Sequence, residues 1–367
     1  QTLFVSTEEI MASWRFTDPI TRTWMAGKPP LIHYRSADAT FRERLLPVDE
    51  QPPKRDVGVI GLGKMGQGIC LQLAEKGWHV TAYNRTPEKL AAVTAAGVTG
   101  AATLKALVAR LKPPRLVWLM VSAGAAVDEL LFGADGLITL LARGDIVVDG
   151  GNSLFEDSAR RAKRLQRQGV EFLDVGVSGG PRGARHGACL MVGGPEKIYR
   201  QLLPLFRDLA VSGGYAYFGS AGAGHFVKMV HNGIEYGMMQ AIAEGFATMK
   251  QSPFTLDLER VADLYNHGSV IESRLVGWLQ SAYKTFGQDL AGVSGSVAHT
   301  GEGEWTVKTA KKFKVPVPII KGSYDFRVNS KRSPSYTGKV SSALRNQFGG
   351  HDVKSEKRKA KSAKLKK

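Results

Sequence analysis

The sequence predicts an α/β fold, in which a doubly wound, mostly parallel sheet is followed by an all-α C-terminal domain. Two observations support this fold class. From Asp56, short apolar runs rich in β-branched residues alternate with helical stretches, as they do in repeated βα units. From Gly222 the strand pattern ends, and residues 222–250 form one continuous helical pattern that shorter ones follow.

Each expected strand is an apolar run bounded by turn residues, and the six lie at 57–62, 78–84, 115–121, 145–151, 171–177 and 188–194. Helical patterns follow the first two strands, at 65–77 and 87–97. Parallel strands need such crossover helices between them, and the usual right-handed crossover produces a doubly wound sheet.

We divide the 367 residues into four parts. Residues 1–54 form an N-terminal extension or linker without an assigned role, because turn formers interrupt any periodic pattern there. Residues 55–221 form the sheet domain, and residues 222–353 form the all-α domain. Residues 354–367 form a basic tail that lacks the apolar residues of a core, so we expect it to be disordered.

The formal net charge of +17 is unevenly distributed along the chain. Residues 354–367 hold eight Lys or Arg and one Glu, whereas residues 1–54 carry seven basic and seven acidic side chains. The remaining +10 lies on residues 55–353, and such a moderately basic body suits a small anionic ligand. We therefore do not expect a nucleic-acid partner. The tail is either a solvated extension or a weak binder of polyanions or membrane surfaces.

Cys70 and Cys189 lie in apolar patterns without close spacing or partner histidines. We predict that both are small buried hydrophobic residues and that the chain has no metal site. No apolar run approaches the roughly 18 to 20 residues that span a bilayer, and the first residues lack the order of a secretory signal. We expect a cytoplasmic protein without a membrane partner.

A glycine-rich turn follows the first expected strand and begins the first helix. Gly61, Gly63 and Gly66 have the G-x-G-x-x-G spacing. The first glycine turns the chain, the second lets backbone approach a pyrophosphate, and the third packs helix against strand. Such spacing also arises by chance in glycine-rich chains. Its position between a strand and a helix predicts a Rossmann-type dinucleotide site, with the phosphates at the helix amides.

The second expected strand ends in Asn84, Arg85 and Thr86, where an NAD enzyme usually has an acid that binds the ribose hydroxyls. A guanidinium there can pair with a 2′-phosphate, and Thr86 and Lys89 can add donors. Alternatively, Arg85 is a surface residue that precedes the next helix. The missing carboxylate favours NADP over NAD as the cofactor.

Two polar segments are candidates for binding a substrate. The Ser-Gly-Gly turn at 178–180 follows a strand and could bind a carboxylate or hydroxyl, although a plain glycine turn has the same pattern. On the long helix, Lys228, His231, Asn232 and Glu235 fall at i, i+3, i+4 and i+7, so they share one face. This spacing also fits a solvated polar face.

Together these segments resemble the 6-phosphogluconate dehydrogenase family over nearly all of residues 55–353. The matching stretches are GLGKMGQG at 61–68, DGGNS at 149–153, VSGGPRGARHGACLMVGG at 177–194, GAGHFVKMVHNGIEYGMMQ at 222–240 and ALRNQFGGH at 343–351. Enzymes that oxidise β-hydroxyacids share the glycine loop, the Ser-Gly-Gly turn and the lysine, but typically lack the H-N-x-x-E-Y pattern. The length of the matching core resembles the short form of the family, with a reduced helical domain.

The resemblance implies oxidative decarboxylation of 6-phosphogluconate to ribulose 5-phosphate and CO2 with NADP, a step of the pentose phosphate pathway. Lys228 is then the general base at the C3 hydroxyl and afterwards an acid, and Glu235 is the acid that protonates C1 of the enediol. The implied substrate-binding residues are Asn152, Ser178, Gly179, Gly180, His231, Asn232, Tyr236, Arg327, Arg345 and His351. Together with the glycine motif, the expected cofactor-binding residues are Gly61, Gly63, Lys64, Met65, Gly66, Asn84, Arg85, Thr86, Lys89, Val121 and Asn152.

Subunit assembly and phosphate binding also follow from the resemblance. The family residues that match Arg345 and His351 reach into a neighbouring subunit's site, which implies a homodimer or homotetramer with shared active sites. One departure concerns the phosphate. Where long-form members have a lysine and a threonine, this chain has Thr300 and Glu302, so a cation is lost and an anion gained near the expected phosphate.

Two other functions remain open at this point. One is an NAD-dependent β-hydroxyacid dehydrogenase that acts on a small unphosphorylated acid; His231, Glu235 and Tyr236 argue against it. The other is a non-catalytic dinucleotide sensor or nucleic-acid-binding protein that uses the basic tail. The candidate base and acid argue against this second function.

Overall fold

The computed structural model describes residues 17–19, 22, 56–298 and 301–353. The chain divides into two compact units, Gln1–Pro52 and Pro53–Lys367. The described part of the first unit includes an exposed ion pair between Arg22 and Asp18, 3.6 Å apart. The predictions for the N-terminal extension fall almost entirely outside the described residues, and those for the basic tail fall wholly outside them.

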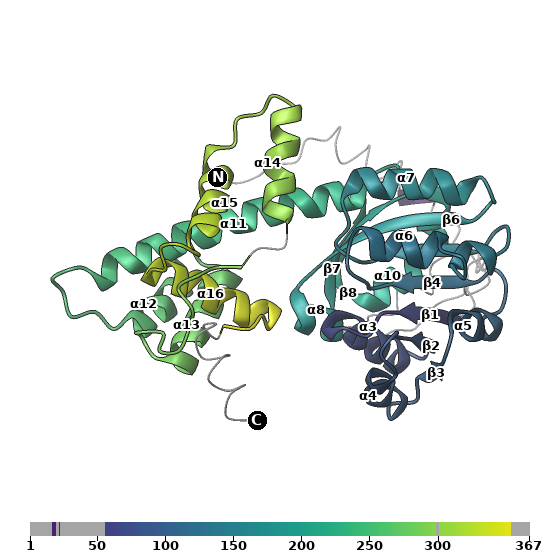
Figure 1. Ribbon diagram of the computed structural model, residues 1–367, viewed down its shortest axis with the longest axis horizontal. Helices are drawn as coiled ribbons and strands as arrows, with labels where there is room; N and C mark the ends of the chain where they lie inside the picture. Colours follow the sequence, from purple (N-terminus) through teal and green to yellow (C-terminus); the bar gives the residue numbers. More distant parts are fainter. Residues whose placement is uncertain (1–16, 20–21, 23–55, 299–300, 354–367) are drawn as a thin grey trace. The chain divides into compact units, whose positions relative to one another are not determined.

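The described strands of the second unit form one eight-stranded sheet, in the order β3-β2-β1-β4-β5-β6-β7-β8 (Figure 1). Their bounds are β1 (Asp56–Ile60), β2 (His79–Tyr83), β3 (Thr99–Ala101), β4 (Leu116–Leu119), β5 (Ile146–Asp149), β6 (Glu171–Ser178), β7 (Ala188–Gly193) and β8 (Ala210–Tyr217). Strands β1 to β6 are parallel, β7 is antiparallel to β6, and β8 is parallel to β7. The expected doubly wound, mostly parallel sheet is confirmed.

The six expected strands are all present, but β3 and β8 were not predicted. β3 has three residues, and one of them is glycine. β8 is largely exposed, contains two glycines, and pairs with β7 through an irregular register. Short or glycine-containing strands lack the continuous apolar pattern by which a strand is recognised in a sequence.

Helices connect the strands and cover the sheet. They are α3 (Lys64–Glu75), η1 (Pro87–Leu90), α4 (Ala91–Thr94), α5 (Leu104–Arg110), α6 (Ala125–Phe132), η2 (Leu137–Thr139), α7 (Phe155–Gln166), α8 (Gly180–His186), α9 (Glu196–Gln201) and α10 (Leu203–Leu209). Neighbouring strand residues face opposite sides: Trp118 belongs to one buried apolar cluster, and Val117 and Leu119 belong to the other. The sheet is therefore buried on both faces, as a parallel sheet requires.

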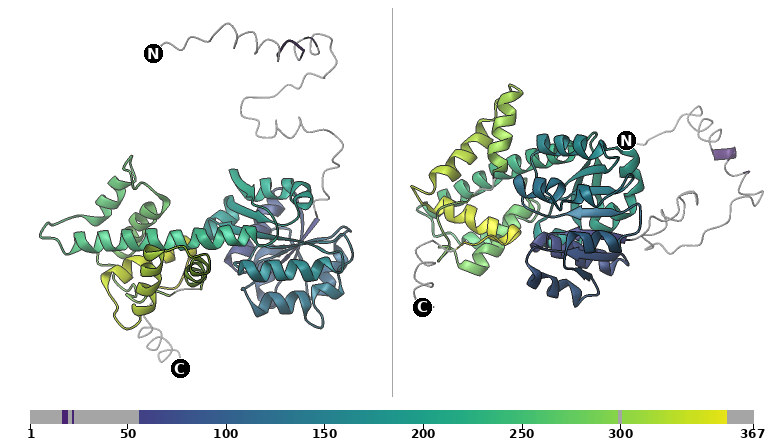
Figure 2. Two further views of the ribbon diagram at one scale, coloured as in Figure 1. Left: turned by 90° about the horizontal axis from the view of Figure 1, so that it is seen from above. Right: turned by 45° about the vertical axis from the view of Figure 1, so that its right-hand side comes forward.

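The all-α region is built along one long helix, α11 (Ala223–Lys250), which Figures 1 and 2 show as a continuous rod. The helices that follow are α12 (Leu258–Tyr265), α13 (Arg274–Phe286), α14 (Glu302–Lys312), α15 (Pro318–Asn329) and α16 (Tyr336–Gly349). A third apolar cluster, which includes Phe246, Leu279 and Leu344, joins α11 to α13 and α16. Among the described helices, none is long and apolar enough to cross a membrane.

The first turn of α11 is fixed to the sheet by a buried carboxylate. Asp174, on β6, accepts hydrogen bonds from the backbone amides of Gly222 at 2.6 Å and His225 at 2.7 Å. A carboxylate at a helix N-terminus satisfies amides that have no partner within the helix and interacts favourably with the helix dipole. Gly224 packs against backbone of β6 and β7, where a Cβ would lie 2.4 Å from the oxygen of Met191. The orientation of α11 relative to the sheet is therefore fixed where its polar face begins.

Candidate active site

The glycine loop lies between β1 and α3, at the point where the strand order reverses between β1 and β4. Gly61 has a φ of 99°, and a Cβ on Gly66 would lie 1.9 Å from the oxygen of Gly61, so neither position accepts a side chain. A Cβ on Gly63 would meet nothing within 4 Å. The space beside Gly63 and the amides that begin α3 fit a pyrophosphate at the switch point of the sheet.

Asn84 stabilises this loop from the end of β2. Its Oδ1 accepts from the amide of Leu62 at 2.8 Å, and its Nδ2 donates to the carbonyl of Thr86 at 2.9 Å. Arg85, Thr86 and Lys89 are exposed. Asn84 thus connects the phosphate loop to the segment expected to bind the ribose, and Arg85 is accessible to a ligand.

A pocket of about 860 Å³ extends from the glycine loop to the helices of the C-terminal region. It is lined by most of the expected site residues, namely Gly63, Lys64, Met65, Gly66, Val121, Asn152, Ser178, Gly179, Gly180, Lys228, His231, Asn232, Glu235, Tyr236, Arg327, Arg345 and His351. Five expected cofactor residues, Gly61, Asn84, Arg85, Thr86 and Lys89, are not part of its lining. The polar face of α11 is therefore the wall of a pocket, and the solvated-face alternative is wrong.

Lys228 and Glu235 lie on the pocket side of α11, and burial shifts their pKa values in opposite directions. Lys228 is 9% exposed and packs against Gly176 of β6, where a Cβ would lie 2.4 Å from the Cβ of Lys228. Burial lowers the pKa of the Lys228 amine, opposed by the negative charges of Glu235 and Glu302. Burial also raises the pKa of the Glu235 carboxyl, opposed by the positive charge of Lys228. Both shifts favour the neutral form of the group.

His231 connects α11 to the Ser-Gly-Gly turn. Its Nε2 lies 3.1 Å from the Ser178 hydroxyl, and its Nδ1 lies 3.0 Å from Oδ1 of Asn232. Because an amide oxygen only accepts, Nδ1 donates to Asn232, and Nε2 accepts from Ser178. Burial and the nearby Lys228 lower the His231 pKa. A neutral imidazole therefore orients two further polar groups beside Lys228, whose Nζ is 3.4 Å from Nδ1.

Two buried guanidinium groups lie at the end of the pocket near Tyr236. Arg327 is 2% exposed, and its guanidinium carbon lies 3.3 Å from the centre of the Tyr236 ring. Arg345 is 7% exposed. Burial lowers the pKa of Arg327 to about 10 and also lowers that of Arg345. Among the described residues neither arginine has a carboxylate within ion-pair distance, so an anionic ligand would compensate two desolvated charges.

Arg345 and His351 line the pocket of their own chain. The expectation that they reach a neighbouring subunit's site concerns a second chain and stays a prediction. Helix α16 packs on α11 and α13, and its buried Leu344 belongs to the apolar cluster there. The turn after α16 is bound to the glycine loop, because Lys64 Nζ donates to the Gly350 carbonyl at 2.5 Å. These contacts bring the C-terminal site residues to Lys228 within one chain.

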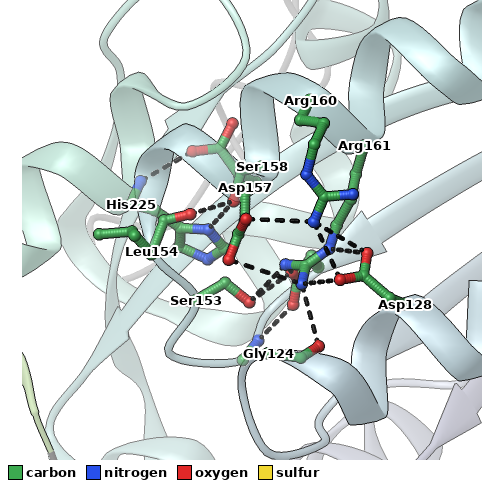
Figure 3. Close-up of polar contacts among 12 residues, drawn as sticks. Gly124, Asp128, Ser153, Leu154, Asp157, Ser158, Arg160, Arg161 and His225 are labelled. Carbon is green, nitrogen blue, oxygen red and sulfur yellow. Dashed lines mark hydrogen bonds and ion pairs between the residues drawn. The ribbon is translucent and has the colours of Figure 1, made fainter.

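The loop after β5 presents Asn152 to the pocket and is fixed by a buried polar network (Figure 3). Asp149 Oδ1 accepts from the amide of Gly151 at 3.1 Å, and Asp149 Oδ2 accepts from the hydroxyl of Ser153 at 2.8 Å. Arg161, which is fully buried, donates to Ser153 Oγ at 3.3 Å and to the Gly124 carbonyl at 3.1 Å. The network holds the backbone on both sides of Asn152.

Arg161 also pairs with Asp128 of α6, with Nε 3.0 Å from Oδ1, and Arg160 pairs with the same carboxylate at 2.9 Å (Figure 3). Together these contacts connect α6 and α7 to the loop that carries Asn152. Burying an arginine is costly unless its donors are paired, and here several acceptors surround it. The sequence suggested Asn152, but it did not reveal this supporting network.

One residue of the pocket differs from the sequence-based expectations. Cys70 is buried as predicted, but Cys189 is exposed and lines the pocket, so the prediction for Cys189 is wrong. Cys189 is opposite Ser178 in the β6–β7 ladder, and alternation along β7 buries Ala188 and Leu190 and leaves Cys189 facing the pocket. Because every residue from Ala188 to Val192 is apolar, the sequence does not show which of them faces the pocket.

Glu302, which the resemblance places near the expected phosphate, accepts a hydrogen bond from Nδ2 of Asn152. Thr300 lies outside the described residues. Glu302 lines the pocket and is 7% exposed. Sequence reasoning found the departure but not the contact, because 150 residues separate the two partners.

A doubly wound sheet whose glycine loop opens into a pocket with a buried lysine is the architecture of nicotinamide-dinucleotide dehydrogenases. The comparisons with known proteins narrow this class. Residues 56–219 match the model of the NAD-binding domain of 6-phosphogluconate dehydrogenase, and residues 224–366 match the model of its C-terminal domain. The chain belongs to the 6-phosphogluconate dehydrogenase family.

Individual relatives agree with this assignment. An NAD(+)-dependent, decarboxylating 6-phosphogluconate dehydrogenase from Haloferax volcanii is 43% identical over 298 residues, which are 81% of this chain and 98% of that protein. The 6-phosphogluconate dehydrogenase structure from Plasmodium falciparum is 32% identical with a TM-score of 0.66, over 77% of this chain and 65% of that one. A 3-hydroxyisobutyrate dehydrogenase from Salmonella typhimurium is similar in fold, with a TM-score of 0.65 at 21% identity, over 78% of this chain and 98% of that one.

Proposed function

We propose that this protein oxidises and decarboxylates 6-phosphogluconate to ribulose 5-phosphate and CO2, with NADP as the electron acceptor. One observation carries the proposal. A lysine with a lowered pKa and a carboxyl with a raised pKa share one face of α11, inside a pocket that continues to the glycine loop. A pair of groups with opposite shifts is suited to remove a proton in one step and to return one in another.

The proposed reaction needs one proton removed and one delivered. A bound nicotinamide would supply the acceptor for the C3 hydride. Neutral Lys228 removes the proton of the C3 hydroxyl as the hydride leaves C3, and the two losses together give a 3-keto acid. As substrate C1 leaves as CO2, protonated Lys228 stabilises the charge on the C3 oxygen. Protonated Glu235 then delivers its proton to substrate C2, which is C1 of the resulting enediol and of the product. His231, Asn232 and the Ser178 hydroxyl hold the hydroxyls and carboxylate of the substrate.

The phosphate of the substrate is proposed to bind Tyr236, Arg327 and Arg345. Support comes from the burial of both guanidinium groups in the pocket. Glu235 acts electrostatically on both arginines and Glu302 on Arg345, but among the described residues neither arginine forms an ion pair. Guanidinium groups bind phosphate through paired hydrogen bonds. His351 lines the same pocket and could provide a further donor.

The decisive assay follows NADPH formation and CO2 release together, with 6-phosphogluconate as substrate. We expect equal molar amounts of both products. Gluconate, which lacks the phosphate, should be a poor substrate because it leaves Arg327 and Arg345 without an anion. Faster oxidation of a small unphosphorylated β-hydroxyacid, without CO2, would replace the proposal with the β-hydroxyacid dehydrogenase alternative.

The preference for NADP over NAD rests on Arg85, which is exposed just after β2. The Haloferax volcanii relative is named as NAD(+)-dependent, so family membership does not determine the preference. We expect Arg85→Asp to lose the preference for NADP, because the new carboxylate repels a 2′-phosphate and can bind a ribose hydroxyl. Equal kcat/KM with both cofactors in the parent protein would contradict this assignment.

The proposed assembly is a homodimer or homotetramer, and two arrangements of its sites are possible. The family resemblance implies sites shared between subunits, whereas the pocket of a single chain supports the proposal that each chain completes its own site. Lys228→Ala and Arg345→Ala homo-oligomers should each be nearly inactive. In a mixed dimer every site then has one defect, so co-expression should restore no activity. Recovery of up to half the parent activity, with mixed dimers verified by two affinity tags, would show instead that Arg345 serves the neighbouring subunit.

A further inference from the structure

Glu302 is a buried carboxylate at the start of α14 that the proposed mechanism does not use. Its hydrogen bond with Asn152 crosses the pocket, from the first turn of α14 to the loop after β5. A carboxylate in such a position is costly to desolvate, so its contacts within the pocket indicate what it does.

The chemistry of the two groups fixes the orientation of the Asn152 amide. A carboxylate oxygen of Glu302 accepts the hydrogen bond, so Asn152 presents its Nδ2 group to Glu302. Because the amide is planar, Oδ1 then lies on the other side of the group. No described protein group donates to Oδ1, so this oxygen is an acceptor available to a hydroxyl or an amide of the reactants.

Both partners are held by contacts that leave little freedom. The Asp149 and Arg161 network fixes the loop of Asn152, as described above (Figure 3). On the other side, Thr306 of α14 donates to the carbonyl of Met229 on α11 at 2.8 Å. A Cβ on Gly303 would lie 2.5 Å from the Tyr236 ring, so the first turn of α14 packs closely on α11. The carboxylate is therefore placed relative to Lys228 by close contacts between α14 and α11.

We propose that Glu302 is a positioning residue for Asn152. Its carboxylate selects the amide orientation that presents Oδ1 to the reactants, and the hydrogen bond joins the cofactor side of the pocket to the helices of the substrate side. This inference rests on the proposed function, since it assigns Asn152 a role in binding or orienting the reactants. It also explains why an anion is tolerated in a pocket that takes a phosphorylated acid: the Glu302 carboxylate is directed at an amide donor.

The test is a double-mutant cycle with Asn152→Ala, Glu302→Ala and the double variant, measured as kcat/KM with 6-phosphogluconate and NADP. If Glu302 acts through Asn152, each single variant should lose roughly tenfold or more, and the double variant should lose little beyond Asn152→Ala. Glu302→Gln keeps an acceptor oxygen and should be closer to the parent than Glu302→Ala. Multiplicative losses in the double variant would overturn the proposal.

A matched control is Glu304→Ala on the same turn of α14, because among the described residues the ion pair of Glu304 is with the exposed Lys308, at 2.7 Å. It should leave kcat/KM unchanged.

The double-mutant cycle of Asn152 and Glu302 is also measured by the thermal midpoint of unfolding, which needs no substrate. If the parent does not turn over 6-phosphogluconate, the proposed function fails. Non-additive midpoints would then still support the contact, whereas additive ones would reject it.

Discussion

The two ends of the pocket differ in whether backbone or side chains form them. The end at the glycine loop, where we propose that the cofactor binds, is called the cofactor end. It is mostly backbone, and its loop is contained in six consecutive residues, 61–66. The other end, proposed to bind the substrate, is called the substrate end. It consists of side chains from α11, α14, α15, α16 and the loop after β5, which span residues 152–351. The cofactor end could therefore be recognised from a local motif. The substrate end needed a resemblance or a structure, because its geometry depends on contacts far apart in sequence.

The largest effect is expected at the substrate end, from Lys228→Met. This variant keeps the apolar stem of the side chain but removes the amine, so both the base and the charge that stabilises the C3 oxygen are lost. We expect kcat to fall by about 10⁴-fold, the upper end of the range for general acid–base catalysis. The affinity for NADP, measured by fluorescence titration, should remain within a few-fold of the parent. Loss of both quantities would indicate that Lys228 also maintains the cofactor end.

Glu235→Gln should have the next largest effect, a fall in kcat of about 10²- to 10³-fold, because glutamine cannot deliver a proton. Tyr236→Phe is the adjacent control and should mainly raise the KM for 6-phosphogluconate.

The pH profile gives an independent measure of both groups. Burial lowers the pKa of Lys228, so activity should persist to lower pH than an ordinary lysine would allow, and fall once the amine is protonated. Burial raises the pKa of Glu235, so activity should fall on the alkaline side as the acid loses its proton. The alkaline fall should disappear in Glu235→Gln. A profile unchanged by this substitution would return Glu235 to a binding role.

At the cofactor end, two glycines of one loop should respond differently. Gly66→Ala places a methyl group against the Gly61 carbonyl and should lower the free energy of unfolding by about 1–3 kcal/mol. Gly63→Ala meets no protein atom within 4 Å, so the thermal midpoint should not change. Its methyl group would occupy the approach of the pyrophosphate and should raise the KM for NADP by about tenfold, or 1.4 kcal/mol. Equal effects of the two substitutions on stability and KM would refute the backbone description of this end.

The smallest effect is expected from removal of residues 354–367, which lie beyond the last candidate site residue, His351. Both kcat and the KM for each substrate should remain unchanged at moderate salt. A large loss of turnover would show that the basic tail belongs to one of the two ends of the pocket.

Local patterns in the sequence were sufficient to predict the fold class, six strands and the long helix. The strands could be recognised because burial on both faces of a parallel sheet produces continuous apolar runs. They were insufficient for β8, whose exposed residues and glycines carry no such pattern. Cys189 was misplaced because one apolar run contained both buried and pocket-facing positions. The contact between Glu302 and Asn152 could not be predicted, since only the folded chain brings α14 to the loop after β5.

The hydrogen bonds to Asp174 attach the first turn of α11 to the sheet, so a rotation of this helix relative to the sheet would be centred at that turn. With a rise of 1.5 Å per residue, Lys228 is about 8 Å from the first residue of the helix and Lys250 is about 40 Å from it. A small rotation about this point would therefore move the distal end of α11 about five times as far as the amine of Lys228. Movement of the helices packed along the outer part of α11 would then displace Lys228 little relative to the glycine loop. If Lys228 is the base that we propose, its position close to the attachment point keeps it in place for the reaction.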